Sequence, residues 1–387
     1  WNEYVNWIGG THHYAIVINE TTCGIDPRNN IRINGDQTDF LLQNIINACT
    51  YDINILAYNF DSTYVAVSDQ ISFYADLPKK PDFHYITKST VDHIDGGVDI
   101  SCYIDNTAVI SRYDIYRSEL DQNNFVNIAS ISFPDNSDMI YYHDTDIETK
   151  SNYYQYQIFP IDTCDAKISS PIIPLGPIDT SISQTILLNS EINTDEASIL
   201  YPDEYTNTIY FNNYFEWLGG VSQYNLYRSV NREPFILIPL HTFYPGDTLM
   251  YVDQVSDFID GNGRFCYYIE AVEGIGNPLS FSENSLSNIS CVSQTPKLFV
   301  PNTFTPNDDN HNELFKPITS FVSEEGYVFS IFNRTGEEIF VTSDPSKGWD
   351  GKYMGVEAQV GDYVYNIQYI NGLGELTQNT GVISLVR

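Results

Sequence analysis

The segment NDDNHNE at residues 307–313 gathers side-chain oxygens of the kind that bind hard cations. Carboxylate and amide oxygens at this density match the ligands that Ca²⁺ selects. We therefore expect a calcium site formed by Asn307, Asp309, Asn312 and Glu313, with Asp308 beside them. The segment lacks the ligand spacing and the turn glycine of an EF-hand, so a solvated turn without an ion is the alternative.

The other residues that could do chemistry form no recognisable catalytic pattern. The 7 histidines are scattered, no Cys-x-x-Cys pair occurs, and no serine lies in a Gly-x-Ser-x-Gly sequence. Pairs of acidic residues are common only because the whole chain is acidic, so they carry no weight as glycosidase catalysts. We expect no enzyme activity within this segment and no cofactor besides the calcium considered above.

The 6 cysteines predict structural disulfides, because two of them fall in each successive stretch of about one hundred residues. Bridges within each stretch would join Cys23 to Cys49, Cys102 to Cys164 and Cys266 to Cys291. Disulfides persist in oxidising compartments, so the pattern favours a secreted or surface protein. Buried free thiols are the alternative.

The composition predicts a folded chain that does not bind polyanions. The 387 residues include 51 acidic and 18 basic side chains, yet 42% of the chain is hydrophobic and 14% is aromatic. A disordered acidic tail would lack those apolar residues. With a net charge of -33, nucleic acid and anionic lipid are poor partners, since both bind through Lys and Arg. No apolar run approaches the roughly 20 residues that span a bilayer.

The elements that must position these residues are indicated by internal repeats. WNEYVNWIGGTHHYAIVI at the start of the chain returns as FNNYFEWLGGVSQYNLYR at residues 211–228, and a weaker copy, AVISRYDIYRS, lies at residues 108–118. The tyrosines that anchor the three copies are Tyr14, Tyr113 and Tyr224. They lie about 100 residues apart, which is the length of a small β-sandwich domain.

Alternating sequences predict an all-β chain. YDINILAY (residues 51–58), YYQYQIFP (153–160) and FCYYIEAV (265–272) each alternate large apolar with polar residues, as half-buried strands do. The order of these segments resembles fibronectin type III domains. We therefore expect tandem immunoglobulin/fibronectin III-like β-sandwiches at residues 1–80, 81–178 and 179–296. The first copy starts in the middle of the repeat, so we expect one or two of its strands, and more of the protein, before Trp1.

Residues 297–387 have a sequence of a different kind. LFVPNTFTPNDDNHNELFKP is followed by YVFSIFNRTGEEIF, KGWDG, VGDYVYNIQYINGLGE and a final GVISLVR. These blocks, in this order at the end of the chain, closely resemble the gliding motility-associated C-terminal domain, which is the type B sorting domain of the Bacteroidetes type IX secretion system. The resemblance implies a C-terminal β-sandwich sorting domain at residues 297–387.

The resemblance also implies which residues the secretion translocon recognises. They are Asn333, Arg334, Gly336 and Glu337 in one turn, Gly348, Trp349, Asp350 and Gly351 in a second, and Arg387 at the end. The family's NGDGxND appears here as NDDNHNE, with Asp308 and Asn310 in place of glycines, and its NRWGE appears as NRTGE. Because only glycine takes left-handed backbone angles at no cost, we expect a different backbone in the loop at residues 307–313.

The function implied by the resemblance is that of a secreted or cell-surface cargo, exported through the periplasm and the outer membrane. Its partners would be the type IX translocon and outer-membrane shuttle or anchor proteins, and an exposed last strand could accept a strand from such a partner. The preceding sandwiches would be spacer or adhesive modules. The alternative is the accessory and sorting region of a longer exported enzyme whose catalytic domain lies before Trp1.

Overall fold

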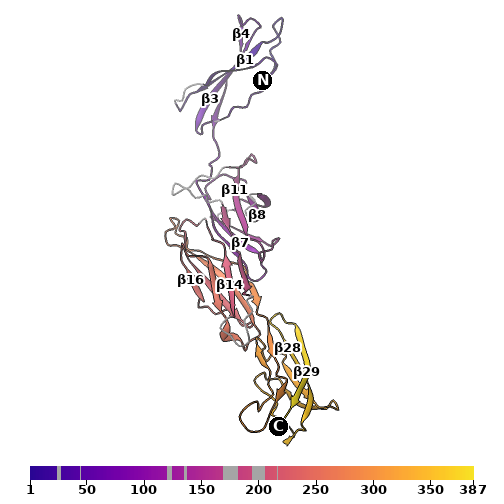
Figure 1. The fold of residues 1–387 in the computed structure, drawn as a ribbon. Helices are drawn as coiled ribbons and strands as arrows, with labels where there is room; N and C mark the ends of the chain where they lie inside the picture. Colours follow the sequence, from indigo (N-terminus) through magenta and orange to yellow (C-terminus); the bar gives the residue numbers. More distant parts are fainter. Residues whose placement is uncertain are drawn as a thin grey trace. The chain divides into compact units, whose positions relative to one another are not determined.

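The structure, a computed structural model, describes residues 1–23, 28–43, 45–119, 124–134, 137–168, 182–193, 205–215 and 217–387. Within these residues the elements are β-strands, joined by turns and by a 3-10 turn at Ser256–Phe258, so the predicted all-β class is confirmed (Figure 1). The chain divides into two compact units: Trp1–Lys80 with Thr107–Val109, and Pro81–Asn106 with Ile110–Arg387.

The first unit contains one antiparallel sheet. Its strands are β2 (Arg28–Asn34), β1 (His13–Glu20), β3 (Cys49–Tyr58) and β4 (Val65–Val67) in that order, with β5 (Ile71–Ala75) also paired to β3. Ile16, Ile18 and Tyr51 are buried on one face. No second sheet covers this unit among the described residues, in contrast to the two domains that follow.

The second domain is a sandwich of two sheets. One sheet has the order β10 (Met139–Asp144), β7 (Val98–Ile104), β6 (His84–Val91), and the other β12 (Ile182–Gln184), β11 (Tyr154–Ile161), β8 (Arg112–Glu119), β9 (Val126–Ser132). Because β12 pairs with β11, this sandwich extends through Gln184, past the boundary that we expected at residue 178.

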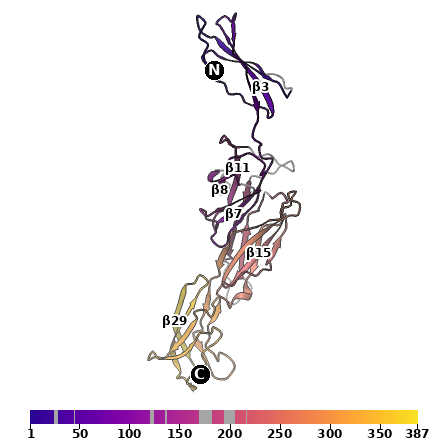
Figure 2. The same ribbon diagram turned by 180° about the vertical axis from the view of Figure 1, so that it is seen from behind.

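The third domain repeats this plan (Figure 2). Its first sheet has the order β13 (Leu188–Ile192), β14 (Thr206–Phe211), β17 (Met250–Gln254). The second has the order β16 (His241–Phe243), β15 (Val221–Val230), β18 (Arg264–Glu273), β19 (Asn284–Leu286), with β20 (Ser290–Ser293) also paired to β18. Alternate residues of β18 are buried, as the period-2 pattern of the sequence predicts.

A partly buried arginine and a buried aspartate connect the two sheets in both of these sandwiches. In the third domain the Nη1 atom of Arg228 lies 2.7 Å from Oδ1 of Asp253, and the Tyr267 hydroxyl donates to Oδ2 of the same carboxylate at 2.7 Å. Arg117 and Asp144 form the same pair in the second domain at 2.8 Å. A buried charge needs a hydrogen-bonded partner, so this arrangement ties the sheets together at a fixed position. It also supports the repeat that the sequence indicates.

The cysteines bear out two of the three expected bridges. Disulfides join Cys23 to Cys49 and Cys266 to Cys291, and the latter two lie directly opposite each other on β18 and β20. The expected bridge between Cys102 and Cys164 is wrong, because both are free thiols. Cys102 is fully buried on β7, whereas Cys164 is exposed in the turn that follows β11 in the other sheet. One thiol is thus enclosed in the core while the other faces solvent.

The C-terminal domain is built on a five-stranded sheet of order β22 (Thr303–Phe304), β29 (Leu376–Leu385), β28 (Gly361–Ile370), β24 (Val328–Phe332), β25 (Glu338–Thr342). Figure 1 shows β28 and β29 side by side, and they are paired over their whole lengths. Two short pairs complete the domain: β21 (Lys297–Phe299) with β23 (Ile318–Ser320), and β26 (Lys352–Tyr353) with β27 (Val356–Glu357).

Candidate recognition surface

Trp349 lies in the core of the C-terminal domain and not on its surface. Its side chain is fully buried, and its ring meets Tyr363 edge-on with the ring centres 4.9 Å apart. The indole Nε1 donates a hydrogen bond of 2.9 Å to the carbonyl of Lys352. This corrects the expectation that Trp349 contacts the translocon, because a ring with no exposed surface can only hold the turn in place.

The glycines beside Trp349 are required by close backbone contacts. A Cβ atom on Gly348 would lie 2.8 Å from the carbonyl oxygen of Phe315, and Gly351 has a φ of +75°. Any other residue at Gly351 would also approach the Pro306 ring at 2.8 Å. Asp350 accepts a hydrogen bond from the Lys352 N–H at 3.0 Å. These contacts of Gly348, Asp350 and Gly351 hold Trp349 in the core. The residue types in GWDG therefore follow from the packing of the domain itself.

Arg387 joins the end of the chain to this turn. Its guanidinium donates from Nη1 to the carbonyl of Ala358 at 2.8 Å and from Nη2 to the carbonyl of Gly351 at 3.2 Å. Nη1 also lies 3.6 Å from a Glu357 carboxylate oxygen. These contacts fix the last residue against the body of the domain, so Arg387 has a structural use as well as the recognition role that the sequence suggests.

The turn NRTGE at residues 333–337 is held by its own side chains. Oδ1 of Asn333 accepts the N–H groups of Thr335 and Glu337, each at 3.0 Å. Nδ2 of Asn333 donates to the Glu337 carboxylate at 2.9 Å, and Gly336 supplies a φ of +82°. Asn333, Gly336 and Glu337 thus build the turn, as turn chemistry expects of these residue types. Arg334 and Thr335 are both exposed, and the Thr335 hydroxyl also donates to Oδ1 of Asn333, at 2.8 Å.

A second turn, NGLGE at residues 371–375, repeats this arrangement. Oδ1 of Asn371 accepts the N–H groups of Leu373 and Glu375 at 3.0 and 2.9 Å, and Gly374 has a φ of +87°. This turn lies against the third sandwich: a Cβ atom on Gly372 would meet Oγ of Ser293. The two turns share one structure, but the second is partly covered by a neighbouring domain.

The guanidinium of Arg334 lies over Gly361 at the start of β28. A Cβ atom on Gly361 would be placed against Nη2 of Arg334, so a larger residue there would push the end of this side chain aside. Arg334, Gly361 and Tyr363 line a cavity of about 260 Å³ with Asn333, Thr335, Gln359, Val360 and Asp362. The lining carries one cation, Arg334, and one carboxylate, Asp362, together with uncharged polar groups that could bond to an extended peptide.

The last strand leaves part of its outer edge open, as the sequence predicts. β29 is paired with β28 throughout, but on its other side it meets only β22, at Ser384 and Leu385. The N–H of Ser384 donates to that side, at 3.0 Å to Asn302. Because N–H groups alternate along a strand, those of Thr380 and Val382 point the same way, to the open edge. Among the described strands none pairs there.

The loop predicted to bind calcium uses its oxygens within itself. The two carboxylate oxygens of Glu313 accept the N–H groups of Asp308 and Asn310 at 3.1 and 3.0 Å. Oδ1 of Asp309 accepts the His311 N–H at 2.8 Å. These bonds shape the loop and leave further lone pairs on the carboxylates, so the calcium site at Asn307, Asp309, Asn312 and Glu313 stays a prediction. Asp308 and Asn310 have φ values of +65° and +66°, so they adopt the left-handed angles that we expected to be lost with the glycines.

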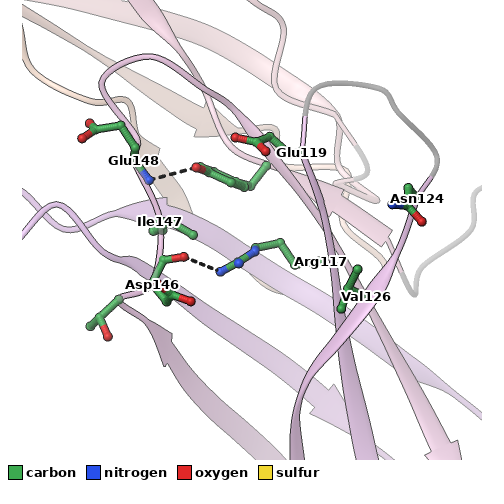
Figure 3. Close-up of a pocket in the computed structure, with 9 residues that line it drawn as sticks. Arg117, Glu119, Asn124, Val126, Asp146, Ile147 and Glu148 are labelled. Atoms are coloured by element: carbon green, nitrogen blue, oxygen red, sulfur yellow. Dashed lines mark hydrogen bonds between the residues drawn. The ribbon is translucent and has the colours of Figure 1, made fainter.

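A larger cavity of about 530 Å³ lies at one end of the second sandwich (Figure 3). Arg117 points into it, but Nη1 already donates to the Asp144 carboxylate and, at 2.9 Å, to the carbonyl of Asp146. The hydroxyl of Tyr154 accepts the Glu148 N–H at 2.9 Å. Of the residues that line the cavity, Arg117 thus serves the joint between the two sheets through its bond to Asp144.

One group of titratable residues was missed by the sequence reasoning. His143 on β10 lies opposite Asp99 on β7, with Nδ1 2.7 Å from its carboxylate, and Nε2 lies 2.8 Å from Asp95. The hydrogen bonds to Asp95 and then to Asp99 raise the pKa of His143. His143 and Asp95 also lie near Asp92, and these three form one of two groups in the described part of the chain that could hold a metal ion; the other includes the bridged Cys23 and Cys49.

Comparison with known proteins identifies the C-terminal domain. Residues 298–385 match the model of the CHU_C type IX secretion signal domain, which confirms the predicted sorting domain and indicates export out of the cell or to its surface. The fibronectin type III relationship of the preceding sandwiches stays a prediction. No curated protein matches the chain. No helix in the described residues is long and apolar enough to cross a membrane.

Among solved structures, one is described as "Crystal structure of tetra-tandem repeat in extending region of large adhesion protein". It aligns with 97% of this chain and 92% of its own, at 14% identity and a TM-score of 0.27.

Proposed function

Because residues 298–385 form a type IX secretion signal domain, we propose that the C-terminal domain is the address of a secreted or surface-exposed cargo and that the preceding domains are passengers. The domain match is the observation that carries this proposal. A signal that is read by a protein partner needs a folded surface and no chemistry of its own. The C-terminal domain offers one, which is supported by a buried aromatic core.

The surface around Arg334 is the part of this domain that we propose the translocon reads. Trp349 is excluded as a contact because it is buried. Of the two turns with the same structure, the one at residues 371–375 lies against the third sandwich, and the one at 333–337 is exposed. The exposed turn also places Arg334 over Gly361, beside the start of β28. In a chain of net charge -33, a cation at a cavity is a distinctive feature for an acidic or main-chain partner.

The sandwiches would then act as a spacer. The second and third share direct hydrogen bonds, including Lys88 to Glu283 at 3.1 Å, and each carries the Arg–Asp pair between its sheets. These bonds hold the sandwiches together and fix their sheets, which supports a role as a spacer or adhesive stalk. The second candidate, the rear part of a longer exported enzyme, is compatible with the same address and differs only in what precedes Trp1.

Charge reversal at one residue tests the recognition surface. The chain with Arg334→Glu is produced in its native host, and the exported fraction is measured by separating medium, cell surface and periplasm. We expect at least a tenfold loss of exported protein, because the guanidinium is replaced by a repelling carboxylate. Lys316→Glu makes the same charge change at an exposed lysine elsewhere in this domain. It is the matched control and should be exported normally.

Unfolding curves of both purified variants separate recognition from folding. If Arg334→Glu folds as stably as Lys316→Glu and is exported as well, the recognition surface lies elsewhere on the domain. Export of the wild-type chain by the same host gives the reference level, and failure of the wild-type chain to leave the cell would contradict the proposed function itself.

A further inference from the structure

The third sandwich meets the second through a short segment that precedes β15. In this segment, residues 214–220, Tyr214 and Trp217 are buried, and both bond to the backbone of β6. Nε1 of Trp217 donates to the carbonyl of Thr87 at 2.7 Å, and the Tyr214 hydroxyl accepts the Ser89 N–H at 3.1 Å. The partner atoms are therefore main-chain groups of a strand at the edge of the preceding sandwich.

The first unit contains the same segment with the same local structure. At residues 4–10, the N–H of Tyr4 donates to the Tyr14 hydroxyl at 3.0 Å, and the equivalent bond before β15 measures 2.9 Å. The rings of Tyr4 and Trp7 are 4.7 Å apart, against 4.2 Å for the equivalent pair. The N–H of Gly10 closes the turn on the Trp7 carbonyl at 3.1 Å, against 2.9 Å.

This copy of the segment is uncovered in the described residues. Trp7 is partly exposed, and Val5 and Ile8 are 76% and 108% exposed. The loop between β3 and β4 adds Phe60, which is 76% exposed. Its ring lies 5.5 Å from that of His12, two residues after the segment. We call Val5, Trp7, Ile8 and Phe60 the Trp7 patch. Apolar clusters of this kind rarely stay uncovered on a soluble domain.

The corresponding loop of the third sandwich also takes part in the contact with its neighbour. Phe281, between β18 and β19, packs against Tyr85 and Tyr103 of the second sandwich, with ring centres 5.9 and 5.3 Å apart. Both loops at this end of the third sandwich are thus occupied by the domain that precedes it. The residues of the Trp7 patch lie in the two equivalent loops of the first unit, which are the segment at residues 4–10 and the loop between β3 and β4. No described residue covers them.

We propose that the Trp7 patch is a docking surface for another β-sandwich that precedes it in the protein. That sandwich would present a strand carbonyl to Nε1 of Trp7 and a strand N–H to the hydroxyl of Tyr4, as β6 does for the equivalent residues. A main-chain partner fits because the bonds in the occupied copy involve no charge. An anionic membrane surface does not fit a chain of net charge -33. The second sandwich has no Trp-x-Gly-Gly sequence before Tyr113, so the segment is not a general feature of the repeat.

The test compares residues 1–387 with the longer natural chain that includes the domain encoded before Trp1. Exchange of the four indole N–H protons is followed by NMR, with Trp7→Phe and Trp217→Phe used to assign the signals. We expect Trp7 to exchange at least tenfold more slowly in the longer chain, because its N–H becomes buried and bonded. Trp217 is the internal control and should be equally protected in both chains.

Stability gives a second readout. Trp7→Ala should lower the unfolding midpoint of the longer chain and leave that of residues 1–387 nearly unchanged, whereas Trp217→Ala should lower both. The proposal is wrong if Trp7 exchanges equally fast in the two chains, or if no sandwich is encoded before Trp1. Protection of Trp7 that grows with the concentration of residues 1–387 would assign the patch to a second copy of the chain and would also overturn the proposal.

Discussion

The ring of Phe321, from the C-terminal domain, meets the ring of Tyr205, from the third sandwich, edge-on with centres 4.8 Å apart. Phe321 is fully buried in the core of the third sandwich, with a φ of +57°, and its N–H donates to the carbonyl of Ile259. Gly263 leaves the space that its Cβ occupies. The signal domain therefore completes the core of its neighbour, and the two should fold and unfold together.

Phe321→Ala should destabilise the third sandwich by about 3 kcal/mol, because a buried aromatic ring leaves a cavity when it is removed. Denaturant unfolding of residues 1–387 measures this loss. Phe299→Ala, at a residue of the same domain that is 55% exposed, is the matched control and should cost less than about 1 kcal/mol. Equal effects of the two substitutions would show that Phe321 does not hold the domains together.

The contact of Phe321 with the third sandwich also predicts which segment is needed to export a fused reporter protein. A fluorescent reporter joined to residues 182–387 should be exported better than one joined to residues 297–387, because the shorter fusion exposes Phe321 to water. Phe321→Ser in the shorter fusion should recover part of the yield by removing the exposed ring. Equal export of the two fusions would mean that the C-terminal domain is autonomous.

The free thiols should react at very different rates. Cys164 is exposed, so a thiol reagent should label it at once in the native protein. Cys102 is buried, which raises its pKa to about 12, and it should react only after unfolding. Peptide mapping without reduction should recover the other four cysteines as Cys23–Cys49 and Cys266–Cys291. A bridge between Cys102 and Cys164 in that map would contradict the structure.

His143 makes a pH-dependent contribution to the second sandwich. Its carboxylate neighbours raise its pKa above the ordinary value of 6.5, so its protonated form stabilises the fold fully below that value. This contribution is lost as the pH rises through the folded-state pKa. The pKa of Asp95 is lowered, by the Gly97 N–H first and by His143 as well, so its contribution is lost as the pH falls through its own folded-state value.

An NMR titration of His143 measures this directly, and His143→Gln should flatten the decline in stability above pH 6.5. A titration midpoint for His143 at or below the ordinary value would contradict the bonds to Asp95 and Asp99.

Calcium should leave the unfolding midpoint of the chain unchanged at about 1 mM, a concentration at which extracellular calcium modules bind. The carboxylates of Glu313 and Asp309 already hold the loop in shape through backbone N–H groups, so we expect the fold to need no ion there. Differential scanning calorimetry with calcium and with a chelator provides the comparison. A rise of several degrees with calcium would restore the ion site that the sequence suggests.

Local patterns predicted the strands and the turns, because alternation and turn chemistry depend on neighbouring residues. The motif of the signal domain could also be identified from the sequence. The role of Trp349 could not be predicted, since its burial depends on contacts with Tyr363 and Phe304. The pairing of Cys102 failed because residue spacing does not tell which sheet a thiol joins. The His143–Asp99 pair requires strand register, and the insertion of Phe321 requires contact between domains, neither of which has a local signature.

The central claim, that the C-terminal domain is the export address, is tested most directly by deleting residues 297–387 in the native host and measuring where the remainder accumulates. Phe321→Ala in the full-length chain controls for loss of stability in the third sandwich, because it disturbs that core and keeps the address. The account predicts that the truncated protein is retained in the periplasm while the Phe321 variant still leaves the cell. Recovery of the truncated protein in the medium or on the cell surface at full yield would contradict it.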